Sequence, residues 1–460
     1  MQTIRREAAA QLGLAVPLAA QQLGLVLMGL VDTAMLGHYH PDAMAGAGVG
    51  NSLFFAVTCL GLGVLLGLDP LLTQALGAGE RWRTPHLVRD GVAVAVRLGA
   101  ALSLAIIAMP YLLAVAGVEP AVADEARVFV YGRVPGVIPF LMQLAYRSAL
   151  QAHGHTRPLL IAVVAGNLIN AALDLVLVFG VPAIGLPALG SIGSATATTL
   201  VTIVTTIYYA YAVGVITREL PPAPAEQVQR PSAIRDLLRV GTPIGLQLAA
   251  EVGAFALASV LAGRLGKVPS AAHQIALQLA STSFAIAMGL GATAAIRVGL
   301  AVGAGDHRAA RRAGLVSLGL GAAVMSTSAL VFVTLPGTLA GLFGTTRTVL
   351  LAAVPLIQIA AVFQLSDGAQ AIGAGALRGA GDTHAAFLAN LGGHYVLGVP
   401  IAIGLGFGAS LGAPGLWWGL TAGLTATAVA LVGRFLWLTT RPIARIEKTT
   451  PTEGPERSSP

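Results

Sequence analysis

Charged side chains are scarce in this chain, at 10% of 460 residues, whereas 55% of the residues are hydrophobic. Soluble domains carry roughly 25% charged residues, so this composition excludes a single soluble core. Cysteine occurs once, at Cys59, which excludes an intramolecular disulfide. Basic and aromatic residues are not interleaved on a soluble face, so we expect no nucleic-acid partner. The chain is predicted to be a polytopic membrane protein whose surroundings are the lipid bilayer.

Long apolar runs divide the chain into twelve expected spans, since about 20 mostly apolar residues cross a bilayer. The runs are continuously apolar rather than alternating, which argues against a β-barrel. We therefore expect an all-α integral membrane protein with twelve transmembrane helices. They lie near 12–36, 46–76, 91–117, 125–150, 159–180, 190–216, 237–263, 271–303, 313–343, 348–377, 385–408 and 415–439.

Lysine and arginine are unevenly distributed over the connections between these spans. Most lie at the termini or in the even-numbered connections. Because basic loops stay on the cytoplasmic side, both termini are predicted to be cytoplasmic, in the cytoplasmic (inner) membrane. The formal net charge of +7 reflects this bias. The odd-numbered connections contain only Arg127, Arg264, Lys267 and Arg347.

The two halves of the chain repeat one another at a shift of about 226 residues. Pro17 followed by LAAQQLG matches Pro243 followed by IGLQLAA, and LGAGER from Leu76 matches VGAGDHR from Val302. A third pair, SALQAHGHTR and GALRGAGDTH, follows in the same order. Each half would hold six spans, an even number, so both halves should enter the membrane in the same sense.

The repeat sets the expected domain organisation. We expect an N-terminal six-helix lobe at 1–217 and a C-terminal six-helix lobe at 237–440. The polar, Pro-rich stretch 218–236 reads as a cytoplasmic linker, and the polar tail 441–460 is expected to be disordered.

Four carboxylates lie inside apolar runs long enough to span a bilayer. Such a group costs about 2.5–3.5 kcal/mol on insertion scales, so each is a candidate for ion or proton coupling. Two lie in each half of the chain. They are Asp32, Asp174, Glu251 and Asp367.

Several Gly-rich segments, in this order and duplicated, resemble the multidrug and toxic compound extrusion (MATE) family, in its NorM-like branch. The segments are LGAGE and VGAGD, GNLINAALD, GLGATAAIRVGLAVGAG and ALRGAGDT. The resemblance covers roughly residues 10–440. It implies two pseudo-symmetric six-helix lobes and the export of organic cations and other amphipathic drugs in exchange for Na⁺ or H⁺.

An oxygen-rich stripe is predicted on the fifth span, where Asn167, Asn170 and Asp174 fall at i, i+3 and i+7. Asp174 and Asp32 should both lie in the outer half of the membrane and could meet. With the Asn170 oxygen and a hydroxyl such as Thr196, they suit a hard cation, Na⁺ included. The family's cation site implies these same positions. The two asparagines could instead only join helices by hydrogen bonds.

Pro17 removes one helical hydrogen bond from the first span. The resemblance suggests that this helix bends when its aspartate is protonated. A static kink is the alternative, because transmembrane helices tolerate proline.

A second group of polar residues lies in the C-terminal half. Glu251 and Asp367 are expected near the middle of the membrane, and Gln247 shares the Glu251 face. Both acids resemble the family's cation-binding carboxylates. His394 and Tyr395 in span eleven are either cleft-facing or packed in the core.

Phe363 departs from some relatives, which have a tyrosine four residues before the acid that corresponds to Asp367. This change removes a hydroxyl ligand, weakens the case for Na⁺ and makes proton coupling more plausible. Two further residues lie near the cytoplasmic surface: Asp69 is expected to pack or form a pair there, and Arg297 to snorkel or form a pair.

We therefore predict a monomeric antiporter without a cofactor, whose coupling ion is Na⁺, H⁺ or both. A lipid-linked precursor flippase of the same superfamily is one alternative, although it would carry more cationic residues along its cavity. An integral-membrane enzyme would need a nucleophile constellation or a metal cluster, which the sequence does not suggest. Two lobes with buried acids suit exchange, so a channel fits this sequence less well than an antiporter does.

Overall fold

The computed structural model describes residues 2–111, 113, 118–222 and 232–446. Within these ranges the chain is helical and contains no strand, apart from an isolated bridge between Val181 and Leu186. The all-α prediction is confirmed. Most of the expected linker, from 223 to 231, and of the expected tail, from 447 to 460, lies outside the described residues.

The first half of the chain forms the N-terminal lobe. Its helices are α1 (Gln2–Tyr39), α2 (Pro41–Leu66), α3 (Leu68–Gly77), α4 (Thr84–Ala108), α6 (Pro120–Arg133), α7 (Val137–Ala152), α8 (Arg157–Phe179) and α9 (Ser191–Arg218).

The second half forms the C-terminal lobe, in which π-helical segments η5 and η6 interrupt the eleventh span. Its elements are α10 (Ile234–Arg264), α11 (Lys267–Gly303), α12 (His307–Thr334), α13 (Pro336–Gly341), α14 (Arg347–Ala380), α15 (Thr383–Leu391), η5 (Gly392–Gly398), α16 (Val399–Ile403), η6 (Gly404–Gly408) and α17 (Ala413–Leu438).

Twelve helical stretches among the described residues are long and apolar enough to cross a membrane, as predicted. The predicted end of the ninth span, at 343, is wrong because α12 ends at Thr334. Pro336 disfavours the helical conformation at the residue before it, and Leu335 accordingly has φ −126° and ψ 34°. The third span begins earlier than predicted, at Thr84.

The sequence repeat reappears as two pairs of matched turns. Gly79 and Gly305 close the LGAGE and VGAGD segments with φ of 79° and 73°. Gly154 and Gly381, in the third pair of matching segments, have φ of 74° and 85°. Left-handed backbone favours glycine because it has no Cβ, so each repeated glycine is required by its turn.

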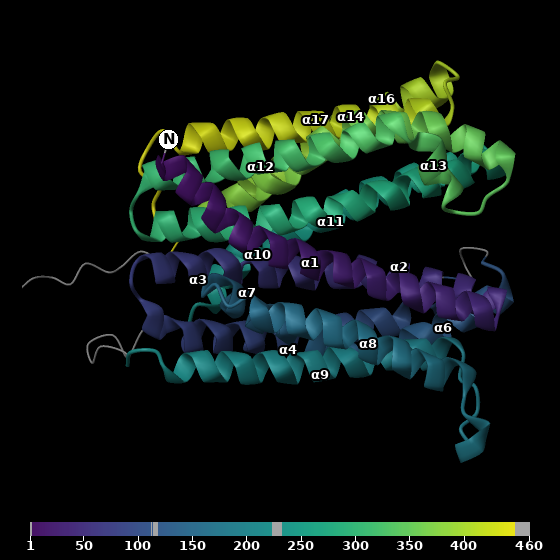
Figure 1. Ribbon diagram of the computed structural model, residues 1–460, viewed down its shortest axis with the longest axis horizontal. Coiled ribbons are helices and arrows are strands. Elements are labelled where there is room, and N and C mark those ends of the chain that lie inside the picture. Colours follow the sequence, from purple (N-terminus) through teal and green to yellow (C-terminus); the bar gives the residue numbers. More distant parts are fainter. Residues whose placement is uncertain (1, 112, 114–117, 223–231, 447–460) are drawn as a thin grey trace, which may run out of the picture.

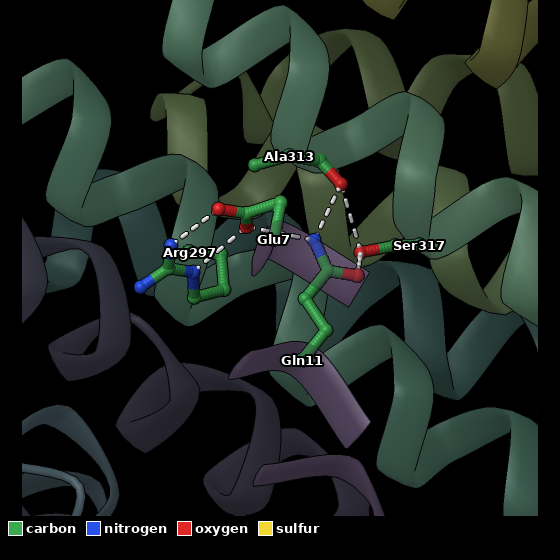
Figure 2. Close-up of polar contacts among 5 residues, drawn as sticks. All are labelled: Glu7, Gln11, Arg297, Ala313 and Ser317. Atoms are coloured by element: carbon green, nitrogen blue, oxygen red, sulfur yellow. Dashed lines mark hydrogen bonds and ion pairs between the residues drawn. The ribbon is translucent and has the colours of Figure 1, made fainter. Parts of the chain in front are cut away.

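Helix α1 belongs to the first half of the sequence but crosses from one lobe to the other (Figure 1). Its start lies among the helices of the second half and packs on α11 and α12, while its later turns pack on α8 and α2. At the start of α1, Gln11 donates from its side-chain amide to the carbonyl of Ala313 on α12 at 2.9 Å (Figure 2). Pro17 lies inside this continuous helix.

Glycines bring the lobes into backbone contact. A Cβ added to Gly63 of α2 would lie 2.2 Å from the Cα of Gly245 in α10. One added to Gly77 of α3 would lie 2.0 Å from the carbonyl oxygen of Leu300 in α11. The close contacts gather at the end of the bundle where α1 begins and α3 ends, so the described structure has its lobes joined at that end.

Candidate functional site

The N-terminal lobe brings two intramembrane acids together. Asp32 of α1 and Asp174 of α8 lie close enough to interact electrostatically. Thr198 of α9 donates its hydroxyl to Asp32 Oδ2 at 3.0 Å, and the Asn170 amide donates to Thr198 Oγ1 at 3.5 Å. Three helices therefore converge on one polar cluster.

Several oxygens of this cluster have no hydrogen-bond partner among the described residues. They are Asp32 Oδ1, Asn170 Oδ1, Asp174 Oδ1 and Oδ2, and Ser194 Oγ. Asn170, Asp174 and Ser194 are fully buried. Buried polar atoms without partners are costly, so such a group calls for a proton, an ion or water. Carboxylate, amide and hydroxyl oxygens are also the ligand types that hard cations prefer.

The threonine that hydrogen-bonds to Asp32 in the structure is not the one named in the sequence analysis. The hydroxyl next to Asp32 belongs to Thr198, and no hydrogen bond joins Thr196 to either acid in the described part of the chain. Two residues along a helix are about 200° apart around its axis, so the two threonines face different neighbours. Asn167 donates to the carbonyls of Gly24 at 3.1 Å and of Val163 at 2.7 Å, which ties α8 to α1.

Arg133, at the end of α6, is a neighbour of the acid pair that the sequence analysis missed. It attracts Asp32 electrostatically, and its guanidinium lies over the ring of Phe54, 4.4 Å from the centroid. The available signal was a basic residue inside the expected span 125–150. A fixed positive charge near Asp32 changes the charge balance of the site.

In the C-terminal lobe, Glu251 of α10 and Asp367 of α14 lie close enough to interact electrostatically. Asn390 of α15 donates its amide to Glu251 Oε2 at 3.3 Å, and Gln370 lines the same small cavity as Glu251. Asp367, Gln370 and Asn390 are buried. The sequence analysis missed Asn390 and Gln370, although each is an amide inside an apolar span.

A cavity of about 40 Å³ adjoins these C-lobe residues. Glu251, Gln247, Gln370 and Arg378 provide its polar lining. A water molecule needs about 10–15 Å³ of such volume, whereas drug-sized ligands occupy roughly 300–1,000 Å³. The cavity therefore has room for a few waters or a small cation.

The other C-lobe candidates serve packing and helix contacts. Tyr395 donates its hydroxyl to the carbonyl of Ala250 at 2.9 Å. His394 is buried, donates from Nδ1 to the Asn390 carbonyl at 3.1 Å and packs edge-on against Phe255. Both residues lie in η5, and single turns of π-helix are often found near functional sites.

Three residues discussed in the sequence analysis, Phe363, Asp69 and Arg297, make aromatic or polar contacts. Phe363 is buried, with its ring centroid 5.6 Å from that of Trp417. The expected pairing of Asp69 is confirmed, because its Oδ2 lies 3.6 Å from Arg378 Nε and its Oδ1 accepts from Ser148 at 2.6 Å. Arg297 is likewise paired, with Glu7.

Comparison with known proteins places these features in a family. The family model described as MatE matches residues 17–176 and again 243–403, so it begins at the two prolines of the sequence repeat. The chain is 39% identical to "Probable multidrug resistance protein NorM" of Burkholderia mallei, over 94% of this chain and 93% of that protein. It is 32% identical to "Multidrug resistance protein MdtK" of Edwardsiella ictaluri, over 96% and 98%.

Solved structures show the same fold. The "eukaryotic MATE transporter AtDTX14" superposes with a TM-score of 0.86 at 22% identity, over 96% of this chain and all of that one. The resemblance noted in the sequence is confirmed, and so is the expectation of a transport protein rather than an enzyme. With both halves matched by the family model and relatives aligned over nearly its whole length, the chain belongs to the MatE family of membrane transporters.

Proposed function

We propose that this protein is a secondary active multidrug efflux antiporter that exports amphipathic or cationic organic compounds in exchange for Na⁺ or H⁺. It would act as a monomer in the cytoplasmic membrane, with both termini in the cytoplasm. Relatives named as multidrug resistance proteins support the substrate class and do not favour a lipid-linked precursor flippase.

The observation that carries the exchange proposal is the N-lobe cluster with its unpartnered oxygens. Two carboxylates this close repel each other when both are ionised, unless a proton or a cation lies between them. Asp32, Asn170, Asp174, Ser194 and Thr198 supply the oxygens to hold either one. Neither species needs a resident cofactor.

Charge balance suggests how many ions the N-lobe cluster takes. Ionised Asp32 and Asp174 contribute two negative charges, and Arg133 contributes one positive charge nearby. One further monovalent charge makes the group neutral, and neutral groups are favoured in a low-dielectric interior. We therefore propose that this site binds one Na⁺ or one H⁺ at a time.

The C-lobe acids would form a second coupling site. The cavity beside Glu251 is large enough for a small cation or water but too small for a drug. An exported compound would therefore bind where the lobes part, and its charge would compete with the coupling ion for the acids. Alternating access then requires the lobe contacts at the α1 end to break, and binding can shift that equilibrium only through different affinities for the two states.

Transport in proteoliposomes tests the proposal. Na⁺ and H⁺ gradients are imposed separately, and the movement of ethidium is followed with wild type and with Asp174→Asn. We expect one gradient, or both, to drive ethidium against its concentration in wild type only. Gradient-independent movement, or transport of lipid-linked sugars instead of ethidium, would contradict the antiporter proposal.

A further inference from the structure

An open groove of about 860 Å³ lies at the end of the bundle where α1 begins. It runs between the first turns of α12, the start of α1 at Ile4, and Thr439 and Thr440, which directly follow α17. Its volume lies within the roughly 300–1,000 Å³ typical of small-ligand sites. The acids of the two coupling sites do not line it.

One face of α12 changes from basic to apolar along the helix. Arg308, Arg311, Arg312, Leu315 and Gly319 fall at i, i+3, i+4, i+7 and i+11, and all of them line the groove. The arginines occupy the first two turns, and the apolar residues follow deeper along the span. The groove is therefore cationic at its mouth and apolar farther in.

The cationic mouth is short of counter-charge. Arg312 is attracted by Glu7, but no carboxylate within the described ranges forms an ion pair with Arg308 or Arg311. The N-terminus of α12 is capped by Asp306, whose Oδ1 accepts from the Ala309 amide at 2.8 Å, and that carboxylate forms no ion pair with either arginine among the described residues. An anion bound at the mouth would supply the counter-charge that Arg308 and Arg311 lack.

We propose that this groove binds an anionic phospholipid, with the headgroup phosphate at Arg308 and Arg311 and an acyl chain along Leu315 and Gly319. Basic sites between transmembrane helices at the membrane surface attract such headgroups. The apolar continuation of this face of α12 favours a lipid over a free phosphate ion. At Gly319 an added Cβ would meet no atom within 4 Å, so the backbone is open where the chain would lie.

Because the groove lies beside the start of α1, a bound lipid would affect how that helix is held. Ile4 of α1 forms one wall, and the α1 segment that follows it is held to the C-terminal lobe by Glu7 and Gln11. A lipid between α1, α12 and α17 would hold the start of α1 in place. Lipid composition would thereby favour the conformation in which the lobes are joined at this end.

Native mass spectrometry of the full-length protein, stripped of lipid in detergent, tests the proposal. Dioleoylphosphatidylglycerol and dioleoylphosphatidylcholine are offered at equal concentration. We expect wild type to retain the anionic lipid preferentially. In Arg308→Gln/Arg311→Gln the ratio of retained anionic to zwitterionic lipid should fall about tenfold. Gly319→Trp, which fills the apolar part without changing charge, should weaken retention as well.

A matched control separates the groove from general membrane charge. Arg235 and Arg239 are exposed at the start of α10 and lie outside the groove. Arg235→Gln/Arg239→Gln removes the same charge and should keep the preference. Equal losses in the two double variants, no preference in wild type, or displacement of the lipid by inorganic phosphate would each overturn the proposal. If Arg308→Gln/Arg311→Gln does not fold, Gly319→Trp decides, and its unchanged retention refutes the site.

Discussion

Glu7 of α1 and Arg297 of α11 form a two-point ion pair between the two halves of the chain, with Arg297 Nε 2.9 Å from Glu7 Oε1 (Figure 2). The neighbouring Gln11 extends the contact, since its Oε1 accepts from Ser317 at 2.9 Å. The side chain of Glu7 is only 10% exposed, so little water can replace Arg297 as its partner.

Glu7→Gln is expected to lower the free energy of unfolding by about 1–2 kcal/mol, less than for a fully buried pair because Arg297 is partly exposed. Thermal melting in detergent measures the effect. Asp124→Asn, in the exposed pair with Arg127, should change little. The double variant Glu7→Gln/Arg297→Gln should be less destabilised than the sum of the single changes, and strict additivity would show that the pair contributes nothing.

Thr198→Val should weaken ion-coupled transport, because it keeps the side-chain volume but removes the hydroxyl that Asp32 accepts from. Thr196→Val is the matched control two residues earlier. We expect the concentration of coupling ion for half-maximal transport to rise severalfold in Thr198→Val alone. A larger effect in Thr196→Val would show that Thr196, as the sequence analysis suggested, is the ligand instead of Thr198.

Glu251→Gln and Asp367→Asn should abolish drug export without unfolding the protein, since an amide keeps the size of the acid but cannot exchange a proton or balance a cation. Asp32→Asn and Asp174→Asn should be similarly damaging. Resistance of cells expressing each variant at normal abundance is the measurement. Glu119→Gln, at an exposed position, is the control, and full resistance in an acid variant would remove that acid from coupling.

His153, in a connection between spans, should make stability depend on pH. Burial, with the nearby charges of His155 and Arg81, lowers the pKa of His153 to about 4 from 6.5. The unfolded chain therefore takes up a proton before the folded chain does, and stability should fall as the pH drops from about 6.5 to 4.

The contribution of His153 should be about 1–2 kcal/mol after allowing for its partial exposure. His153→Gln should flatten this part of the pH profile of the melting temperature, whereas His384→Gln, at an exposed position elsewhere in the chain, should leave it. Identical profiles for wild type and His153→Gln would exclude this histidine as the cause.

The charge bias of the connections predicts the orientation in the membrane. An enzyme reporter that works only outside the cytoplasm should give no signal when fused to the C-terminus. The same reporter inserted after Arg264, between the seventh and eighth spans, should be active. Strong activity at the C-terminus would contradict the twelve-span orientation.

The sequence located the acids and the helices well because both leave local signals. An apolar run of membrane length is visible without knowing its neighbours, and Asp174 inside such a run is conspicuous because burying a charge in lipid is costly. The partners of these acids were harder to identify. Asn390 reaches Glu251 across 139 positions of sequence, and no local pattern encodes such a contact.

The sequence by itself determined the membrane class, the twelve spans, the internal repeat and the four intramembrane carboxylates, because composition and periodicity are local properties. Only the tertiary structure decided that Thr198 rather than Thr196 meets Asp32, that Arg133 lies near Asp32, and that α1 crosses to the other lobe. Those outcomes depend on how each helix is rotated and packed. A rotation of about 100° per residue is enough to exchange one neighbour for another.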